Sequence, residues 1–278
     1  MIVYMEKFEE VEKSIITSFR KHIWAKFVKA IKDYDMIKDG DKIAVCISGG
    51  KDSSLLAKCF QELKKHGTDN FELEFLCMNP GYNEENKNRI IENAKILNIP
   101  IHIFETDIYD RVYTITDRPC YLCARMRRGY LYENAKKMGC NKIALGHHFD
   151  DVIETILMGM LYGGQYQTMM PKLKSTSHPE MELIRPLYLV REGDIINWKK
   201  KNELEFIKCG CRFTEVCWSD GKNSSSSKRA ATKRLLEYLR NENKSIDMNI
   251  FRSSQNVNID TVLGYKQNGE RHYFLEEY

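Results

Sequence analysis

The amino-acid sequence predicts an α/β fold built on a doubly wound, mostly parallel sheet, with an N-terminal helix and a helical C-terminal extension. Two observations lead to this expectation. Short apolar runs with the pattern of buried strands alternate along the chain with amphipathic helical segments, which is typical of βαβ units. In addition, polar motifs directly follow the runs at 43–47 and 142–145. Doubly wound proteins bind their ligands beyond the C-terminal ends of such strands.

The first predicted element is an amphipathic helix from Glu6 to Asp35. Apolar residues recur near every fourth position along this segment, and charged residues fill its opposite face. We expect the helix to pack on the next domain or on a partner, and not to act as a basic RNA-binding arm. A turn at Gly40 separates it from the first strand.

A glycine-rich loop joins the first predicted strand to a helix that runs to about Lys64. Glycine permits unusual backbone dihedrals, so such a turn can aim backbone N–H groups and a helix N-terminus at a phosphate. A lysine in the loop adds a cation, and an aspartate adds a candidate magnesium ligand. Because GxxxxGK[ST] does not occur in the chain, this is not the loop of a P-loop NTPase. The loop sequence is Ser48-Gly49-Gly50-Lys51-Asp52-Ser53.

The alternation of strands and helices continues along the chain. Further strands are predicted at 71–77, 101–104, 142–145 and 182–185, and further helices at 84–97, 121–138 and 152–162. From Gly193 onward we expect helices and loops. Two more polar segments, Met78-Asn79 and 146–151, follow predicted strands, and we expect them at the same sheet edge as the glycine-rich loop.

The composition indicates a globular protein. Of its 278 residues, 42% are hydrophobic and 29% are charged, and no stretch approaches eighteen uninterrupted apolar residues. The segment Met1 to Glu10 lacks the apolar core of a signal peptide, so we expect a cytoplasmic protein without a membrane span. A net charge of +4 does not by itself establish nucleic-acid binding, but three basic groups favour it. These groups are Arg125, Arg127 and Arg128; Lys199 to Lys201; and Lys228, Arg229, Lys233 and Arg234.

Nine cysteines in such a protein are expected to be core residues, metal ligands or reactive thiols, and not disulfides. Cys120-Tyr-Leu-Cys123 places two thiols close enough to share one metal centre. Three interpretations of this pair stay open: a redox dithiol, half of a zinc site, or part of an iron–sulfur site. Further candidate ligands are Cys209, Cys211 and Cys217. The remaining four are predicted to be small hydrophobic residues: Cys46, Cys59, Cys77 and Cys140.

Several segments together carry a resemblance to a known family. The glycine-rich loop matches the SGGxDS signature of PP-loop ATP pyrophosphatases, of the adenine nucleotide alpha hydrolase-like superfamily. Further segments, in the same order along the chain, resemble the tRNA 2-thiocytidine synthetase (TtcA-type) branch of that family. They are the run from Met36 to Ser53, Cys120 to Gly129, Lys142 to Asp151, Tyr162-Gly163-Gly164 and Ile184-Arg185-Pro186-Leu187. The likeness covers roughly Phe27 to Cys209, and motifs in one order are more specific than any one alone.

The resemblance implies a nucleotide site and an iron–sulfur site. ATP and Mg²⁺ would bind at Ser48, Gly49, Gly50, Lys51, Asp52, Ser53, Met78, Gly146 and His147. A [4Fe–4S] cluster would be held by Cys120, Cys123 and Cys209, leaving one iron open for sulfide. Here the chain departs from its relatives, because Cys209-Gly210-Cys211 makes Cys211 a rival third ligand. Catalytic roles would fall to Lys51, Asp52, Arg127 and Asp151.

The implied activity is ATP-dependent tRNA thiolation. The C2 oxygen of an anticodon-loop cytidine would be adenylated, and sulfur would then replace it with loss of AMP. Besides tRNA, such an enzyme needs a sulfide or persulfide donor such as a cysteine desulfurase, and a homodimer is one option for its assembly. The corresponding organisation is an N-terminal helical segment at 1–38, a PP-loop domain at 39–190, and a helical region at 191–278 that carries the third cluster cysteine.

Three other functions would each share some of these motifs. A TtuA-type 2-thiouridine synthetase would share the loop and the cluster, but those relatives carry zinc-ribbon cysteine pairs near both ends. This chain has no cysteine before Cys46 or after Cys217. A lysidine synthetase has no need of Cys120 and Cys123. A non-catalytic, metal-containing RNA-binding protein has no need of Lys51, Asp52 and Asp151.

Overall fold

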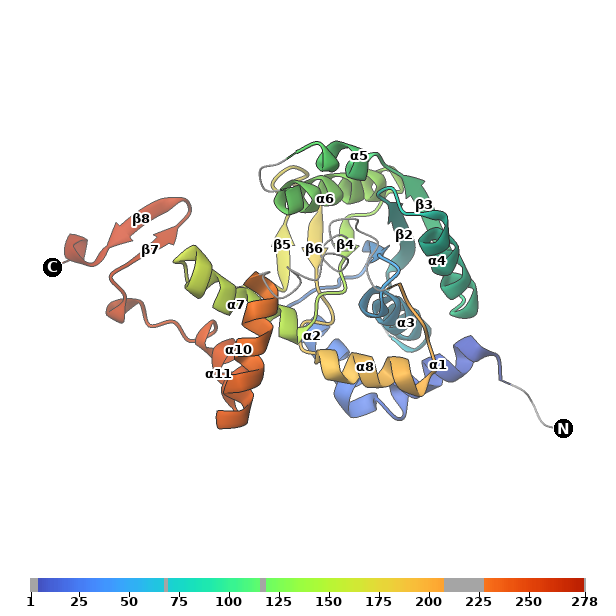
Figure 1. Ribbon diagram of the computed structural model, residues 1–278, viewed down its shortest axis with the longest axis horizontal. Helices are drawn as coiled ribbons and strands as arrows, with labels where there is room; N and C mark the ends of the chain where they lie inside the picture. Colours follow the sequence, from blue (N-terminus) through green and yellow to red (C-terminus); the bar gives the residue numbers. More distant parts are fainter. Residues whose placement is uncertain (1–4, 68–69, 116–118, 208–227, 278) are drawn as a thin grey trace. The chain divides into compact units, whose positions relative to one another are not determined.

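The computed structural model describes residues 5–67, 70–115, 119–207 and 228–277 (Figure 1). The chain divides into two compact units. Unit 1 comprises Met1–Asp151 and Met170–Ser225, and unit 2 comprises Val152–Met169 and Ser226–Tyr278. The predicted three-part division into 1–38, 39–190 and 191–278 differs from this division into two units and stays a prediction. Within the described residues, no helix is long and apolar enough to cross a membrane.

Unit 1 is built on a six-stranded sheet with the order β3-β2-β1-β4-β6-β5. All neighbouring pairs are parallel except β5 with β6. The predicted fold class, a doubly wound and mostly parallel sheet, is therefore confirmed. The chain order reverses between β1 and β4, and this switch point is where such sheets bind ligands. The strands are β1 Lys42–Ile47, β2 Glu72–Asn79, β3 Ile101–Glu105, β4 Lys142–Ala144, β5 Lys172–Lys174 and β6 Glu182–Ile184.

Helices connect the strands, as the alternating pattern predicted. On one sheet face, Tyr132 and Ala135 of α6 pack against Ala44 and Cys46 of β1 and against Ile143 of β4. Because side chains alternate along a strand, the intervening residues of β1 point to the opposite face. The helices of this unit are α1 Lys7–Ile16, α2 Ala25–Asp33, α3 Lys51–His66, α4 Glu84–Ile96, α5 Ile108–Tyr113, α6 Pro119–Lys137 and α8 Glu192–Lys201; α7, Phe149–Gly163, continues into unit 2.

The N-terminal segment is not one continuous helix. A π-helical stretch, Arg20–Trp24, separates α1 from α2. At the end of α1 the carbonyl of Lys13 accepts both the backbone N–H of Thr17 at 3.0 Å and its hydroxyl at 2.6 Å, and such side-chain bonds often bend helices. The apolar stripe is nevertheless buried as predicted, with Val11, Ile15 and Phe27 fully shielded from solvent.

Unit 2 contains more than the predicted helices and loops. After α10 (Lys228–Glu242) and α11 (Ile246–Ser253), strands β7 (Gly264–Gln267) and β8 (Glu270–Tyr273) form an antiparallel hairpin. The expectation of helices and loops from Gly193 onward is therefore wrong for this segment. Asn268-Gly269 forms the tight turn between the strands, and an Asn-Gly pair between short runs is the sequence signal that would have identified it.

A buried ion pair fastens the N-terminal helix α1 to α3. Lys58 is fully buried, and its ammonium group donates to Glu12 and, at 2.7 Å, to the carbonyl of Leu97. Lys65 also pairs with Glu12. Burial alone would raise the pKa of Glu12, but the hydrogen bonds and charges of both lysines outweigh burial, so its pKa is lowered.

We therefore expect Glu12→Gln to remove a pH-dependent part of the stability. Because the folded-state pKa lies below the ordinary 4.5, the contribution of Glu12 is fully present above pH 4.5 and is lost as the pH falls through the folded-state value. The variant should lose about 3 kcal/mol at neutral pH, since Lys58 stays buried without its carboxylate. Urea unfolding at several pH values should show the difference from wild type shrinking below pH 4.5. Glu10→Gln, which affects an exposed pair with Lys7, should change stability by less than about 1 kcal/mol.

Candidate active site

The glycine-rich loop lies between the C-terminal end of β1 and the first turn of α3. Gly50 is the N-cap of α3, so the loop delivers the helix N-terminus to the sheet edge. The hydroxyl of Ser53 accepts a hydrogen bond from the backbone N–H of Ser48 at 3.1 Å and donates to the carbonyl of Gly50. These bonds within the loop hold its backbone in one shape.

Gly49 is required by both its conformation and its surroundings. Its φ of +80° is unfavourable for a side chain, and a Cβ would lie 2.5 Å from Cγ1 of Ile90 and 2.8 Å from Cδ1 of Ile207. Gly40 has nearly the same φ, +82°, but a Cβ there would meet nothing within 4 Å. The two glycines therefore separate the cost of backbone conformation from the cost of close packing.

Gly49→Ala is expected to destabilise the protein by about 3 kcal/mol, of which the backbone accounts for about 1 and overpacking for the rest. Gly40→Ala should cost only the backbone part, about 1 kcal/mol. Urea unfolding of both variants measures the two costs. Equal losses in the two variants would show that the packing of Ile90 and Ile207 against the loop is unimportant.

Lys51 and Asp52 form a charged group with a residue that the sequence analysis did not assign. The ammonium of Lys51 lies 3.1 Å from Oδ1 of Asp52 and 3.2 Å from Oε1 of Glu192, the first residue of α8. Burial lowers the pKa of Lys51, but both carboxylates together outweigh burial and raise it. Lys51 is thus a firmly protonated cation at the helix N-terminus. Glu192 reaches it from a distant segment, so spacing in the sequence could not reveal it.

The carboxylate of Asp52 has one oxygen, Oδ1, that is paired with the ammonium of Lys51 at 3.1 Å but lacks a hydrogen bond within the described part of the chain. Oδ1 is buried and accepts no hydrogen bond among the described residues, although Lys51 and, at 4.0 Å, Nε2 of His148 lie near it. Burial raises the pKa of Asp52, and the positive charge of Lys51 opposes this only in part. A magnesium ion could bind Oδ1, which accepts no hydrogen bond among the described residues, so this side chain fits the predicted magnesium ligand.

The segment after β4 lies against the glycine-rich loop, as predicted. A Cβ on Gly146 would stand 3.0 Å from the backbone of Asp52 and Ser53, so only glycine allows this close approach. His148 and Asp151 then cap α7 reciprocally. The backbone N–H of His148 donates to Asp151 at 3.1 Å, and that of Asp151 donates to Nδ1 of His148 at 3.4 Å. Asp151 therefore has a structural task beside any catalytic one.

Asp150 fixes the start of α8, and with it the position of Glu192. Its carboxylate accepts the backbone N–H of Glu192 at 2.7 Å and pairs with Arg191 at 3.3 Å. Asp150 is 6% exposed, so these partners offset the cost of burying its charge. The adjacent acids of this segment thus have different tasks, because Asp150 anchors α8 whereas Asp151 caps α7.

Helix α6 and the end of β2 form a second part of the site. Met78 is buried in a cluster with Tyr109, and Cys123 packs against this cluster. Arg127 donates to the hydroxyl of Tyr109 at 2.8 Å, and its Nε is buried without a hydrogen-bond partner among the described residues. Burial lowers the pKa of Arg127, but Tyr109, Tyr82 and Cys123 outweigh burial and raise it.

A tyrosine connects this part to the glycine-rich loop. The hydroxyl of Tyr82 lies 3.5 Å from the carbonyl of Ser48, and its ring packs edge-on against Tyr109. The predicted site residues from Ser48 to Ser53, Met78, Cys123, Arg127 and Gly146 to Asp151 all belong to unit 1. They come from the segments that follow β1 and β4, from the last residues of β2, and from the N-terminal half of α6.

Two of the candidate cluster cysteines lie on α6. Cys120 is in the first turn of α6, and Cys123 follows on the same helix, half-buried. Cys209, its rival Cys211, and Cys217 all lie outside the described residues. The cysteines predicted to be small core residues are all buried, and burial raises the pKa of Cys77 to about 12 and of Cys140 to about 11.

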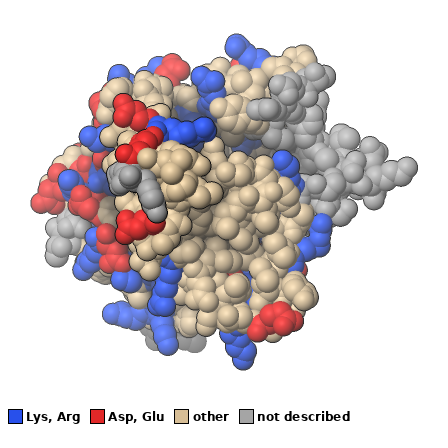
Figure 2. All heavy atoms as spheres, turned by 90° about the vertical axis from the view of Figure 1, so that its left-hand side faces the viewer, with Lys and Arg blue, Asp and Glu red and all other residues tan. Residues whose placement is uncertain are grey.

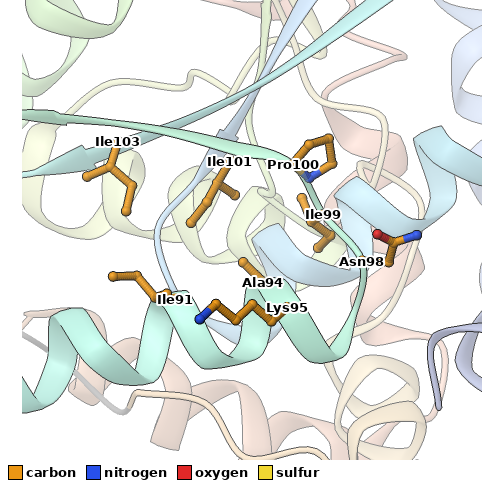
Figure 3. A pocket seen from close by; sticks show the side chains of 8 residues that line it. All are labelled: Ile91, Ala94, Lys95, Asn98, Ile99, Pro100, Ile101 and Ile103. Atoms are coloured by element: carbon orange, nitrogen blue, oxygen red, sulfur yellow. The ribbon is translucent and has the colours of Figure 1, made fainter. Parts of the chain in front are cut away.

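A cavity of about 390 Å³ lies elsewhere in unit 1, between α4 and β3 (Figure 3). Its lining is mostly aliphatic, with Ile91, Ile99, Ile101 and Ile103 pointing into it, and none of the predicted site residues contributes to it. This cavity lies outside the candidate active site.

The fold and the site define a nucleotide-binding α/β protein whose phosphate loop opens α3 at the switch point. A sequence model of the PP-loop domain matches residues 19–209. The chain is 41% identical over 186 residues to tRNA-cytidine(32) 2-sulfurtransferase of Neisseria meningitidis serogroup C. The aligned region covers 65% of this chain and 57% of the Neisseria protein. The chain is 34% identical over 233 residues to the enzyme of that name from Geobacter sulfurreducens, covering 82% and 87%.

The chain belongs to the tRNA-cytidine(32) 2-sulfurtransferases of the PP-loop family, a family of enzymes, which confirms the predicted branch. It spans little more than half the length of the Neisseria relative. A solved structure with the same fold is the U34-tRNA thiolase NcsA from Methanococcus maripaludis with its [4Fe-4S] cluster. The match has a TM-score of 0.64 at 21% identity and covers 91% of this chain and 83% of that one.

Proposed function

We propose that this protein is an ATP-dependent tRNA sulfurtransferase that converts a cytidine in tRNA to 2-thiocytidine. Its relatives are named for cytidine 32. The observation that carries the proposal is the meeting of two chemical parts in unit 1. The loop residues Lys51 and Asp52 provide a phosphate and metal site. Arg127, which neighbours Cys123, contacts Tyr109. The ring of Tyr109 packs against that of Tyr82, whose hydroxyl lies 3.5 Å from the carbonyl of Ser48 in the loop.

In the first step of this mechanism the cytidine is activated. Its C2 oxygen attacks the α-phosphorus of ATP, and the bond from that phosphorus to the bridging oxygen of pyrophosphate breaks. Loop N–H groups and Lys51 would bind the negatively charged phosphates, and Asp52 would hold magnesium through its buried Oδ1. Glu192 keeps Lys51 oriented, because the two side chains are paired at 3.2 Å.

In the second step sulfur replaces the activated oxygen. A sulfur nucleophile forms a bond to C2, and the C2–O bond breaks as AMP leaves. Adenylation makes this possible because it turns a poor leaving group into a good one. Arg127 is a half-buried cation whose Nε is shielded from solvent and donates no hydrogen bond among the described residues, so it would stabilise negative charge that develops beside Cys123.

We assign the sulfur-delivering centre to a [4Fe–4S] cluster on Cys120, Cys123 and Cys209, with Cys211 as the rival third ligand. Residues three positions apart in a helix are neighbours on its surface, and the first two ligands have this spacing in α6. Cys123 is half-buried beside the guanidinium of Arg127, whose positive charge would offset the negative charge of a cluster held there. When bound, the cluster would supply an open iron that carries sulfide to C2.

We propose that the basic groups contact tRNA. Their members differ in whether an ion pair already holds the side chain. Arg229 and Lys233 pair with the buried Glu154 at 3.2 and 3.6 Å, so both hold unit 2 together. Arg125 and Arg128 are exposed on α6 and are better placed to meet phosphates. On the face shown in Figure 2, basic and acidic side chains are interspersed around a broad uncharged area.

The proposal also includes a cytoplasmic location, a cysteine desulfurase as sulfur donor, and a homodimer.

The test is a thiolation assay with anaerobically reconstituted protein, unmodified tRNA, ATP, Mg²⁺ and sulfide. Nucleoside analysis of the digested tRNA should show 2-thiocytidine, together with pyrophosphate released only when tRNA is present. Formation of 2-thiouridine would contradict the choice of base. Pyrophosphate release without any thiolated nucleoside would contradict the sulfur-transfer function.

A further inference from the structure

Arg185 and His147 are brought together by the backbone at the ends of β4 and β6. The N–H of Leu145 donates to the carbonyl of Ile184 at 3.0 Å, so the two strands leave the sheet side by side. The N–H of Arg185 donates in turn to the carbonyl of Pro171 at 2.9 Å. The position of Arg185 is therefore set by main-chain bonds and does not depend on its side chain.

The guanidinium group of Arg185 is buried in an unusual environment. The residue is 7% exposed and forms no ion pair with a carboxylate in the described part of the chain. Its Nε donates to Nδ1 of His147 at 3.3 Å, and its Nη1 donates to the carbonyl of Met170. Burial lowers the pKa of Arg185 to about 10, which still leaves the group protonated at neutral pH. A buried cation of this kind needs a specific reason to be there.

The contact with Arg185 determines where His147 carries its proton. A protonated guanidinium has only donors, so Nδ1 of His147 must accept and cannot bear hydrogen. A doubly protonated ring would also carry hydrogen on Nδ1, so the imidazole that accepts this bond is neutral. His147 is consequently the tautomer with hydrogen on Nε2, and this N–H is a donor.

We propose that Arg185 is a positioning residue that fixes His147 as a neutral Nε2–H donor toward a phosphate of the bound nucleotide. His147 follows Gly146, whose close approach to the backbone of Asp52 and Ser53 places it at the phosphate loop. The proposal rests on the proposed function only in that ATP binds at this edge. It gives a role to the buried Arg185, which belongs to the Ile184-Arg185-Pro186-Leu187 motif but has no role assigned from the sequence.

The first test needs no variant. Long-range ¹⁵N–¹H spectra of ¹⁵N-histidine-labelled protein, without nucleotide, report the protonation of each ring nitrogen. There are seven histidines, and loss of one signal set in His147→Ala assigns the resonances. The proposal requires an unprotonated Nδ1 and a protonated Nε2 near pH 7. A proton on Nδ1, or a doubly protonated ring, would overturn it.

The second test is a double-mutant cycle on MgATP affinity, measured by calorimetry on the full chain. Arg185→Met and His147→Ala should each weaken binding about tenfold, and the double variant should also weaken it about tenfold. A hundredfold loss in the double variant would mean that Arg185 does not act through His147. Arg185→Lys should recover part of the affinity because it restores a charged donor. Arg89→Gln, on the exposed face of α4, is the matched control and should bind MgATP like wild type.

The two proposals fail in different ways. Wild-type protein that binds MgATP but thiolates no tRNA contradicts the proposed function and leaves the role of Arg185 intact. Wild-type protein that thiolates tRNA while His147 carries its proton on Nδ1 contradicts the role of Arg185 alone. Protein that binds no MgATP contradicts both.

Discussion

Cys123→Ala is expected to abolish tRNA thiolation while leaving MgATP binding unchanged. The thiol is half-buried on α6 beside Arg127 and lies outside the phosphate loop. Its removal would take one ligand from the proposed cluster without disturbing Lys51 or Asp52. We expect thiolation to fall by roughly a thousandfold or more, the size of effect seen when a group essential to the chemistry is removed. Iron content after anaerobic reconstitution and nucleoside analysis measure the two consequences.

Cys140→Ala provides the matched control for Cys123. Cys140 lies just after the same helix, but it is buried in the core, where its pKa is raised to about 11. This variant should keep iron and activity and lose about 1 to 2 kcal/mol of stability from the cavity it leaves. Retention of iron and full thiolation by Cys123→Ala would refute the assignment of Cys123 as a ligand.

Asp52→Asn is expected to reduce ATP turnover by a factor of about 10² to 10³ without destabilising the protein. The loss of activity follows from losing the charged oxygen that would hold magnesium. Stability should be unchanged or should rise by up to about 1 kcal/mol. Burial raises the pKa of Asp52 above its ordinary 3.8, so its charged form is less favourable in the folded state, and asparagine removes that cost at neutral pH.

Asp150→Asn, in contrast, is expected to destabilise the protein. Its carboxylate accepts the N–H of Glu192 and pairs with Arg191, so losing the charge should cost about 1 to 3 kcal/mol. Urea unfolding and tRNA-dependent pyrophosphate release, measured on both variants, compare the two acids. A strong loss of stability in Asp52→Asn would show that Asp52 is a structural residue.

The sequence predicted the sheet because buried strands and amphipathic helices have distinct periods. The prediction failed where a strand was too short to show a pattern or where the apolar pattern continued across an irregular turn of helix. β5 has only three residues, Lys172–Lys174, too few for an alternating pattern, and no strand was predicted there. The continuous stripe from Glu6 to Asp35 hid the π-helical break at Arg20–Trp24, since the apolar residues face the core on both sides of it.

Motifs identified the parts of the candidate site, but not the tertiary partners that orient them. The segments around Lys51 and Gly146 could be recognised because each follows a strand directly. Glu192 and Arg185 reach them from far along the chain: the sheet order brings Arg185 to His147, and Asp150 holds the start of α8, where Glu192 lies. The two adjacent acids also have different structural roles that the motif does not distinguish: Asp150 anchors α8, whereas Asp151 caps α7.

The most direct test of the account follows the oxygen atom that sulfur replaces. An anticodon stem–loop RNA, or a full tRNA, carrying ¹⁸O at C2 of the target cytidine would be incubated with reconstituted protein, ATP and sulfide. Adenylation at the C2 oxygen predicts one ¹⁸O in the AMP released for each 2-thiocytidine formed, as measured by mass spectrometry. Unlabelled AMP accompanying 2-thiocytidine would contradict the proposed activation of the cytidine by ATP.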